Sequence, residues 1–200
     1  MIKRIFDIFV AIVVLIILLP IYILVLMLIW IFMGRPIFFI QERAGLHGKP
    51  FNIIKFRTMK ELFDKKGKCL PDEKRITRIG KFLRATSLDE LPQIFNILKG
   101  EMSLVGPRPQ MYEFMEHYSE TQKRRHEVRP GITGLAQVNG RNNLSWEEKF
   151  KLDVDYVDNH NMIMDLKIIL KTVVVLLKRE GIDNPDVKVG AARFVSPSEL

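Results

Sequence analysis

The chain contains 200 residues, which suffice for one domain with an appendage but not for two full domains. Its net charge of +8 at pH 7 favours anionic partners, namely lipid headgroups, nucleotides or nucleic acid. The single cysteine, Cys69, excludes an intramolecular disulfide and a cysteine-rich metal site. A mean hydropathy of +0.06 is high for a soluble protein, and the apolar excess is concentrated in the first 33 residues.

An uncharged apolar run extends from Ile8 to Gly34, longer than the about 20 residues that a membrane-spanning helix needs. The run is too long for a signal peptide, and no cleavage site of small residues follows it. Pro20 lies near its middle, where it removes one backbone N–H and predicts a break in the helix.

Basic residues flank this run on both sides, with Lys3 and Arg4 before it and Arg35 and Arg43 after it. In membrane proteins, the flank that carries more basic residues usually lies in the cytoplasm. Because both flanks are basic here, this rule gives no orientation for a straight span. Two topologies stay open: a one-pass anchor with a tolerated proline, and a helix that turns at Pro20 and returns to the cytoplasmic face. The second satisfies the charge rule at both ends, and we expect it.

Residues 36–40 and 51–59 have the composition of two short strands, with turns predicted over residues 41–49. Lys55 and Arg57 lie on one side of the second strand, where they are either solvated or line an anion site. Both explanations fit the pattern.

Residues 75–84 are amphipathic, since basic side chains recur every three positions and apolar ones lie on another side. This pattern is typical of a helix that lies in a membrane interface, and also of an ordinary solvated helix. The basic residues are Arg75, Arg78, Lys81 and Arg84.

Residues 87–100 predict a helix with two carboxylates, Asp89 and Glu90, in its first turn. Ser87 and Glu90 have the spacing of a capping box, and Gly100 suits the C-terminal cap. Acids favour the positive end of a helix dipole, which is a purely structural explanation. Arginines precede and follow this acidic pair, however, and a membrane anchor lies at the N-terminus, a combination suited to phosphoryl chemistry at a membrane.

Arg108 stands between Pro107 and Pro109, which fix the backbone and favour a preset anion-binding position. Further helices are expected over residues 110–128, from the capping box at Ser145 to about Val157, and over residues 165–178. Together these elements predict an α+β fold that is mainly helical, with short strands in a small core. No Walker A or Gly-x-Gly-x-x-Gly loop occurs.

The chain contains seven motifs whose sequence and order resemble those of the small bacterial sugar transferases, the monotopic phosphoglycosyl transferases. They lie at residues 3–7, 55–59, 87–91, 105–109, 129–134, 137–141 and 152–154. The resemblance covers roughly residues 1–180, and the chain is most similar to members of minimal size. Leu135 departs from the family, in which many members have tryptophan, but it touches no proposed chemistry.

The resemblance implies transfer of a sugar 1-phosphate from a UDP-sugar to undecaprenyl phosphate, giving UMP and a polyprenyl diphosphosugar. It makes Asp89 the nucleophile that forms an aspartyl-phosphosugar, with Glu90 beside it as a ligand of Mg²⁺, for which Mn²⁺ is expected to substitute. A carboxylate at a helix N-terminus should stay ionised. Similarity to the minimal members favours an N-acetylated amino sugar.

The expected substrate-binding residues combine this resemblance with charge placement. They are Lys55, Arg57, Arg84, Arg108, Arg129, Gln137, Asn139, Arg141 and Asp153. The expected organisation is a re-entrant helix over residues 1–34, a catalytic domain over residues 35–181 and a tail over residues 182–200. The family implies a site at the cytoplasmic face of the bacterial inner membrane, with phospholipid and later glycosyltransferases as partners and no nucleic acid.

A different class of function also fits the anchor and the charge, namely a membrane-bound basic adaptor without catalytic activity. It leaves unexplained the acidic pair at Asp89 and Glu90 and the fixed position of Arg108. Release of UMP from UDP-sugars in the presence of a polyprenyl phosphate distinguishes the two.

Overall fold

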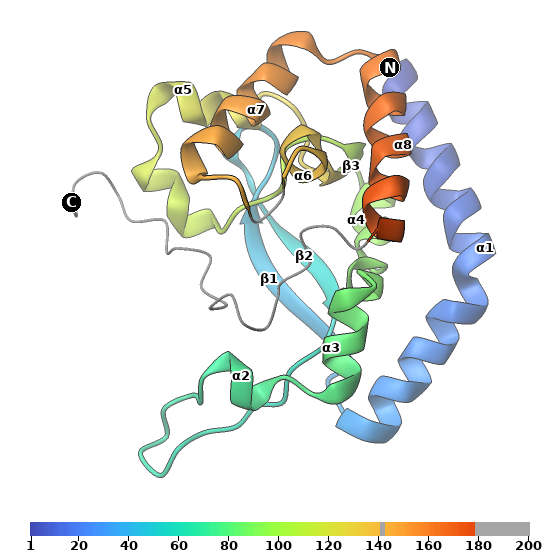
Figure 1. Cartoon of the computed structure of the whole chain (residues 1–200), viewed down its shortest axis with the longest axis vertical. Coiled ribbons are helices and arrows are strands. Elements are labelled where there is room, and N and C mark those ends of the chain that lie inside the picture. The colour runs from blue at the N-terminus through green and yellow to red at the C-terminus, as the bar shows by residue number, and fades with distance from the viewer. Residues whose placement is uncertain (141–142, 179–200) are drawn as a thin grey trace.

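A computed structural model describes residues 1–140 and 143–178 (Figure 1). The described part is mainly helical, with two small two-stranded sheets, which confirms the predicted α+β class. Strands β1 (Phe38–Ala44) and β2 (Pro50–Phe56) form an antiparallel hairpin. Strands β3 (Ser103–Val105) and β4 (Gly131–Thr133) form a short parallel pair. The predicted tail over residues 182–200 lies outside the described residues.

Helix α1 (Ile2–Met33) continues through Pro20, so the proline does not divide it into two helices. Pro20 is exposed inside the helix, and the helix axis changes direction clearly near its middle, in keeping with the predicted bend (Figure 1). One missing N–H is compatible with continued helix because the turns on both sides keep their own hydrogen bonds. Among the described residues, α1 is the one helix long and apolar enough to cross a membrane.

The N-terminal end of α1 binds the rest of the molecule through charged side chains. Lys3 forms an ion pair of 2.5 Å with the buried Asp165, and Arg4 donates to the carbonyl oxygens of Ile97 and Leu98. Buried Asp7 accepts a hydrogen bond from the hydroxyl of Ser103 and another from the backbone of Leu104. These contacts fix the first turns of α1 to β3 and to the end of α4 (Gln93–Lys99).

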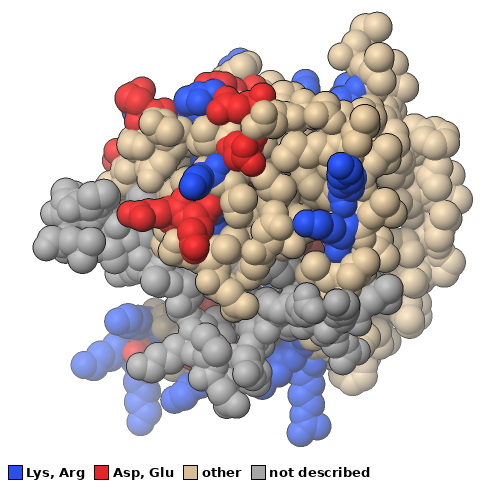
Figure 2. All heavy atoms as spheres, turned by 45° about the horizontal axis from the view of Figure 1, so that its top comes forward, with Lys and Arg blue, Asp and Glu red and all other residues tan. Residues whose placement is uncertain are grey.

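The C-terminal half of α1 is bound to the same body. Tyr22, Val25 and Ile29 are buried in a core cluster with Phe56 of β2 and Leu83. The edge of the molecule formed by α1 carries almost no charged side chains, whereas acidic and basic residues gather on the opposite side (Figure 2). One face of α1 is therefore packed on the domain, and its outer face is apolar.

The hairpin is longer than predicted. Phe38 pairs with Phe56 at one end and Ala44 pairs with Pro50 at the other, so residues 41–44 are strand and not turn. The connection is the short 3₁₀ turn η1 (Leu46–Gly48).

The predicted helix over residues 75–84 is split into α2 (Asp72–Arg75) and α3 (Arg78–Ala85). Thr77 begins α3 as an N-cap whose hydroxyl accepts from the backbone N–H of Gly80. Leu83 is fully buried against the core cluster that contains α1. Leu83 therefore packs on protein, whereas Phe82 on the same helix is 57% exposed, so a contact of α3 with the membrane interface stays a prediction.

The predicted helix over residues 110–128 is also interrupted. It consists of η3 (Tyr112–His117), α5 (Glu120–Lys123) and η4 (Arg124–His126). A new capping box at Ser119 starts α5 and so ends the preceding turn.

The remaining helices are α6 (Leu135–Val138), α7 (Trp146–Asn159) and α8 (Met162–Lys178). The capping box at Ser145 is confirmed: its hydroxyl accepts from the N–H of Glu148, and the Glu148 side chain accepts in return. Gly100 ends α4 in the left-handed conformation with φ 90°, as predicted.

Candidate active site

The acidic pair lies in a short 3₁₀ turn, η2 (Leu88–Glu90), between α3 and α4. Ser87 has a left-handed backbone with φ 56° and caps nothing with its side chain, so the predicted capping box is wrong. Leu88 and Leu91 pack into the core cluster shared with α1 and α3. Because these leucines anchor the turn from inside, Asp89 and Glu90 are held in a fixed place beside β2.

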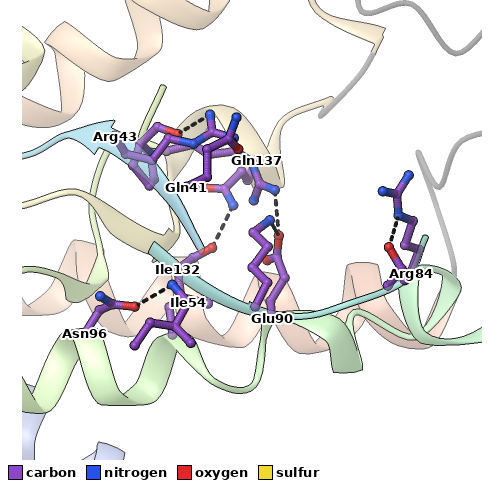
Figure 3. A network of polar contacts seen from close by, with 12 residues as sticks. Gln41, Arg43, Ile54, Arg84, Glu90, Asn96, Ile132 and Gln137 are labelled. Carbon is purple, nitrogen blue, oxygen red and sulfur yellow. Dashed lines mark hydrogen bonds and ion pairs between the residues drawn. The ribbon is translucent and has the colours of Figure 1, made fainter. Parts of the chain in front are cut away.

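Glu90 is bound by two cations at one oxygen. Its Oε1 accepts from Lys55 Nζ at 2.7 Å and from Arg108 Nη2 at 2.6 Å (Figure 3). The Glu90 side chain is only 16% exposed. Burial by itself would raise the pKa of this carboxyl, but the charges and hydrogen bonds of Arg108 and Lys55 outweigh it and hold the pKa well below its ordinary value.

Asp89 has a different environment, since no described side chain forms an ion pair with it. Burial, followed by repulsion from Glu90, raises the pKa of Asp89 to about 6. The charges of Lys55, Arg84 and Arg108 act in the opposite direction but are weaker. Burial therefore acts against the stabilisation expected from a helix N-terminus, although a carboxyl with a pKa of about 6 is still mostly ionised at pH 7.

Two arginines lie near the acidic pair. Arg84 at the end of α3 donates from Nε to the hydroxyl of buried Thr58 at 3.0 Å, and its charge acts on Asp89 (Figure 3). Arg108 keeps 44% of its side chain exposed while it binds Glu90. Its backbone carbonyl accepts from Arg125 Nη2 at 2.7 Å. The structure thus brings Lys55, Arg84 and Arg108 together at the acidic pair, as the sequence predicted.

Arg57 and Arg129 are engaged elsewhere, contrary to the sequence prediction. Arg57 donates to the carbonyl oxygens of Met33, Gly34 and Arg35 at the end of α1. Arg129 donates from Nε to the carbonyl of Gly100 at 2.9 Å, at the end of α4. Carbonyl groups at helix C-termini lack partners within the helix and attract cations, which explains both placements.

Asp153 does not line an open pocket. It is 4% exposed and forms an ion pair of 2.6 Å with Arg125, which is equally buried. Arg125 in turn reaches the backbone of Arg108, so Asp153 belongs to the support behind the site. The reason for the difference is that Arg125, which the sequence analysis did not single out, occupies the carboxylate.

Three polar residues after Pro130 were predicted to bind substrate, and the structure places them differently. Gln137 donates to the carbonyl of Ile132 at 2.7 Å (Figure 3), and its buried Oε1 has no hydrogen-bond partner within residues 1–140 and 143–178. Asn139 contacts Leu135 and Lys171 at the end of α6, not the acidic pair. Arg141 lies outside the described residues.

Two residues near the site were missed by the sequence analysis. Thr58 is buried and orients Arg84, and the alternation of β2 past Phe56 was the only signal for its position. Arg43 lies within reach of Arg108 because β1 extends to Ala44, although the residue was predicted to lie in a turn.

The acidic pair offers the oxygen ligands that a hard divalent cation prefers. No group of three or more His, Cys, Asp or Glu side chains that could hold a metal ion occurs in the part of the chain that the structure describes. This donor set fits Mg²⁺, which is commonly held by one or two carboxylates together with substrate phosphates and water. It does not fit a fully protein-ligated Zn²⁺ site.

A sequence model of the bacterial sugar transferase family matches residues 1–179. The chain is 50% identical over 198 residues to the uncharacterized sugar transferase EpsL of Bacillus subtilis, covering 99% of this chain and 98% of the relative. The match confirms the resemblance drawn from the motifs.

Two further relatives have activities in their names. One is an undecaprenyl-phosphate galactose phosphotransferase of Salmonella typhimurium, 40% identical across 90% of this chain and 41% of the relative. The other is a UDP-glucose:undecaprenyl-phosphate glucose-1-phosphate transferase of Klebsiella pneumoniae, 41% identical across 86% of this chain and 39% of the relative. The chain therefore spans about two fifths of the length of these two proteins.

Proposed function

Because this chain belongs to the bacterial sugar transferase family, we propose that it transfers a sugar 1-phosphate from a UDP-sugar to undecaprenyl phosphate, with release of UMP. The names of the Salmonella and Klebsiella relatives support both the donor and the lipid acceptor. Those names specify galactose and glucose, whereas the minimal size of this chain favoured an N-acetylated amino sugar. The identity of the sugar stays a prediction.

One observation carries the assignment of roles within the acidic pair. Glu90 accepts two short hydrogen bonds from cations, whereas Asp89 has no ion-pair partner among the described residues. A carboxylate engaged by Lys55 and Arg108 is a weak nucleophile, because both donors withdraw its charge. The unpaired carboxylate of Asp89 is free to attack.

In the proposed first half-reaction, an Asp89 carboxylate oxygen forms a bond to the β-phosphorus of the donor. The bond from that phosphorus to the bridging oxygen breaks, and UMP leaves with its electron pair. In the second half-reaction, a phosphate oxygen of undecaprenyl phosphate attacks the same phosphorus and displaces the Asp89 carboxylate. No proton transfer is needed, since both the leaving group and the acceptor are anions.

The cationic residues supply the charge neutralisation that attack by one anion on another requires. Lys55 and Arg108 hold Glu90 in place, and Arg84 approaches Asp89 from α3. Glu90 would hold Mg²⁺, which when bound neutralises charge on the diphosphate. This ion is a proposal that rests on the donor set.

The contacts of α1 support a placement at one face of the membrane. Lys3 and Arg4 at its start and Met33 at its end bind the same domain. A straight span would separate these ends by the thickness of the bilayer, so the domain could not bind both. We propose that α1 enters and leaves on the cytoplasmic side, which brings a water-soluble donor and a lipid acceptor to one site.

The test is to incubate the full chain in detergent micelles or nanodiscs with a UDP-sugar alone and to weigh the intact protein. A mass increase of one phosphosugar, with stoichiometric UMP release, is expected for the unchanged chain and should be absent in Asp89→Asn. Asparagine keeps the size of the side chain, so this variant should fold. Lipid product without any adduct or early UMP release would show direct transfer, and no UMP with any donor would favour the adaptor.

A further inference from the structure

A small polar cavity of about 40 Å³ lies beside the ion pairs of Glu90. Its polar walls include Arg43 of β1, Lys55 of β2, Gln93 at the start of α4, Arg108 and Gln110. A cavity of this size holds a few water molecules or one small polar group.

Two hydrogen-bond donors in the walls have no partner among the residues that the structure describes. Gln93 is 2% exposed, and its amide nitrogen Nε2 is buried without a hydrogen bond. The Nε of Arg43 is likewise buried and unpartnered, although its other nitrogens bind Gln41 at 2.5 Å and the carbonyl of Pro109 at 3.4 Å. A buried donor without a partner costs about 1–3 kcal/mol, so native proteins keep few of them.

The walls also carry more positive than negative charge. Three cations, Arg43, Lys55 and Arg108, line the cavity, and two of them, Lys55 and Arg108, share the carboxylate of Glu90. Burial, together with repulsion from Arg108, lowers the pKa of Arg43 to about 10. A bound anion would relieve this repulsion and supply acceptors to the unpartnered donors.

We propose that Arg43 and Gln93 form a phosphate subsite, which binds the phosphate group of a substrate next to Glu90. The cavity offers N–H donors to oxygen atoms that only accept, which is the chemistry of a phosphate and not of a metal ion. The inference rests on the proposed function for the origin of that phosphate. It comes either from the departing nucleotide or from the polyprenyl phosphate that replaces it.

The test compares ligand pairs that differ only in the phosphate group. Binding of UMP and uridine is measured by calorimetry on the full chain in nanodiscs, and binding of polyprenyl phosphate and polyprenol is measured in the same system. The variants are Gln93→Met, which keeps the side-chain length, and Arg43→Gln. The matched control is Arg124→Gln, which removes one charge from an exposed ion pair with Asp158.

Both site variants should weaken phosphate binding about ten-fold or more, as expected for losing a charge-assisted or buried hydrogen bond. Uridine and polyprenol affinities should not change. Gln93→Met should also keep or raise the melting temperature, because it removes an unpartnered buried amide. A merely structural glutamine would give the opposite pattern, a lower melting temperature with unchanged affinity.

The outcomes separate the two sources of the phosphate. A loss confined to UMP assigns the subsite to the nucleotide, and a loss confined to polyprenyl phosphate assigns it to the lipid. A loss of both shows a subsite used in turn by the two. Unchanged phosphate affinity in both variants, while the unchanged chain binds UMP, would overturn the subsite alone. Failure of the unchanged chain to bind any of these phosphates would instead contradict the proposed function.

Discussion

Arg125 binds Asp153 through two nitrogens, Nε at 3.0 Å and Nη2 at 2.6 Å, in an ion pair that is almost fully buried. The same Nη2 donates to the carbonyl of Arg108, so α7 holds the loop that presents Arg108 to Glu90. Removing one partner of a buried ion pair leaves an uncompensated charge and costs about 3–5 kcal/mol.

We therefore expect Asp153→Asn to lower the free energy of unfolding by several kcal/mol, and to reduce turnover because the Arg108 loop loses its support. Asp158→Asn on the same helix is the control, since it disrupts an exposed pair worth less than about 1 kcal/mol. Urea unfolding followed by circular dichroism measures both variants. Equal effects at the two positions would show that the Arg125 pair does not support the site.

Arg108→Lys should lower the rate of UMP release about ten-fold or more, although the charge is kept. The guanidinium gives one nitrogen to Glu90 and leaves others for a phosphate oxygen, whereas a lysine ammonium cannot reach both in this geometry. Arg124→Lys, at an exposed ion pair, should have no effect. Near-normal activity of Arg108→Lys would make Arg108 a support for Glu90 only.

Removal of divalent cations should abolish UMP release, and added Mg²⁺ or Mn²⁺ should restore it. The reason is that the acidic pair lies beside the cationic residues, where an oxygen-ligated ion suits the carboxylate of Glu90. The measurement is the initial rate after EDTA treatment and desalting. Full activity in excess chelator would contradict this prediction and leave the charge neutralisation to the arginines.

His126 should make the fold less stable in mild acid. Burial, followed by the charge of Arg125, lowers the pKa of His126 to about 4, and its Nδ1 donates to the carbonyl of Gly45 in the neutral form. The unfolded chain has the ordinary value near 6.5 and binds the proton first as the pH falls. This stabilisation is therefore complete above about pH 6.5 and is lost progressively down to about pH 4.

Between pH 7 and pH 5 the expected loss of unfolding free energy from this group is about 2 kcal/mol. Urea unfolding at both pH values measures it, and His126→Asn, whose amide can donate to the same carbonyl, should lack this part of the pH dependence. An unchanged pH dependence in the variant would assign the effect to other groups.

The sequence predicted those features that depend on neighbours along the chain. Ser145 caps α7 and Gly100 ends α4 because each motif is complete within a few residues. Ser87 has the same local pattern as Ser145, yet Leu88 and Leu91 are drawn into the core and turn its backbone left-handed. Packing between distant segments therefore overrode the local signal at the point where the acidic pair is placed.

The same reason explains which cations were assigned correctly. Arg108 is fixed by its own prolines and reaches Glu90 as predicted. Arg57 and Arg129 instead meet carbonyl groups at the ends of α1 and α4, which a count of charges along the chain does not reveal. Arg125 pairs with Asp153, which lies 28 residues later in the chain, and no sequence pattern predicts a contact at that separation.

The topology of α1 gives the last prediction. A straight helix of this length extends about 48 Å, more than the about 30 Å of the apolar layer, so a one-pass span would place its ends on opposite sides. Lys3 and Met33 nevertheless bind one domain, through Asp165 and Arg57 respectively. We therefore expect both ends of α1 on the cytoplasmic side.

The experiment probes a cysteine on each side of α1 in intact cells. The native Cys69 is exposed and follows α1, so it reports on the C-terminal end of the helix. Ile2→Cys in a Cys69→Ser background reports on the preceding end, where position 2 is also exposed. A membrane-impermeant maleimide should label neither cysteine in intact cells and both after permeabilisation. Labelling of position 2 alone in intact cells would show a one-pass span, and the contacts of Lys3 and Arg4 with the domain could then not form in the membrane.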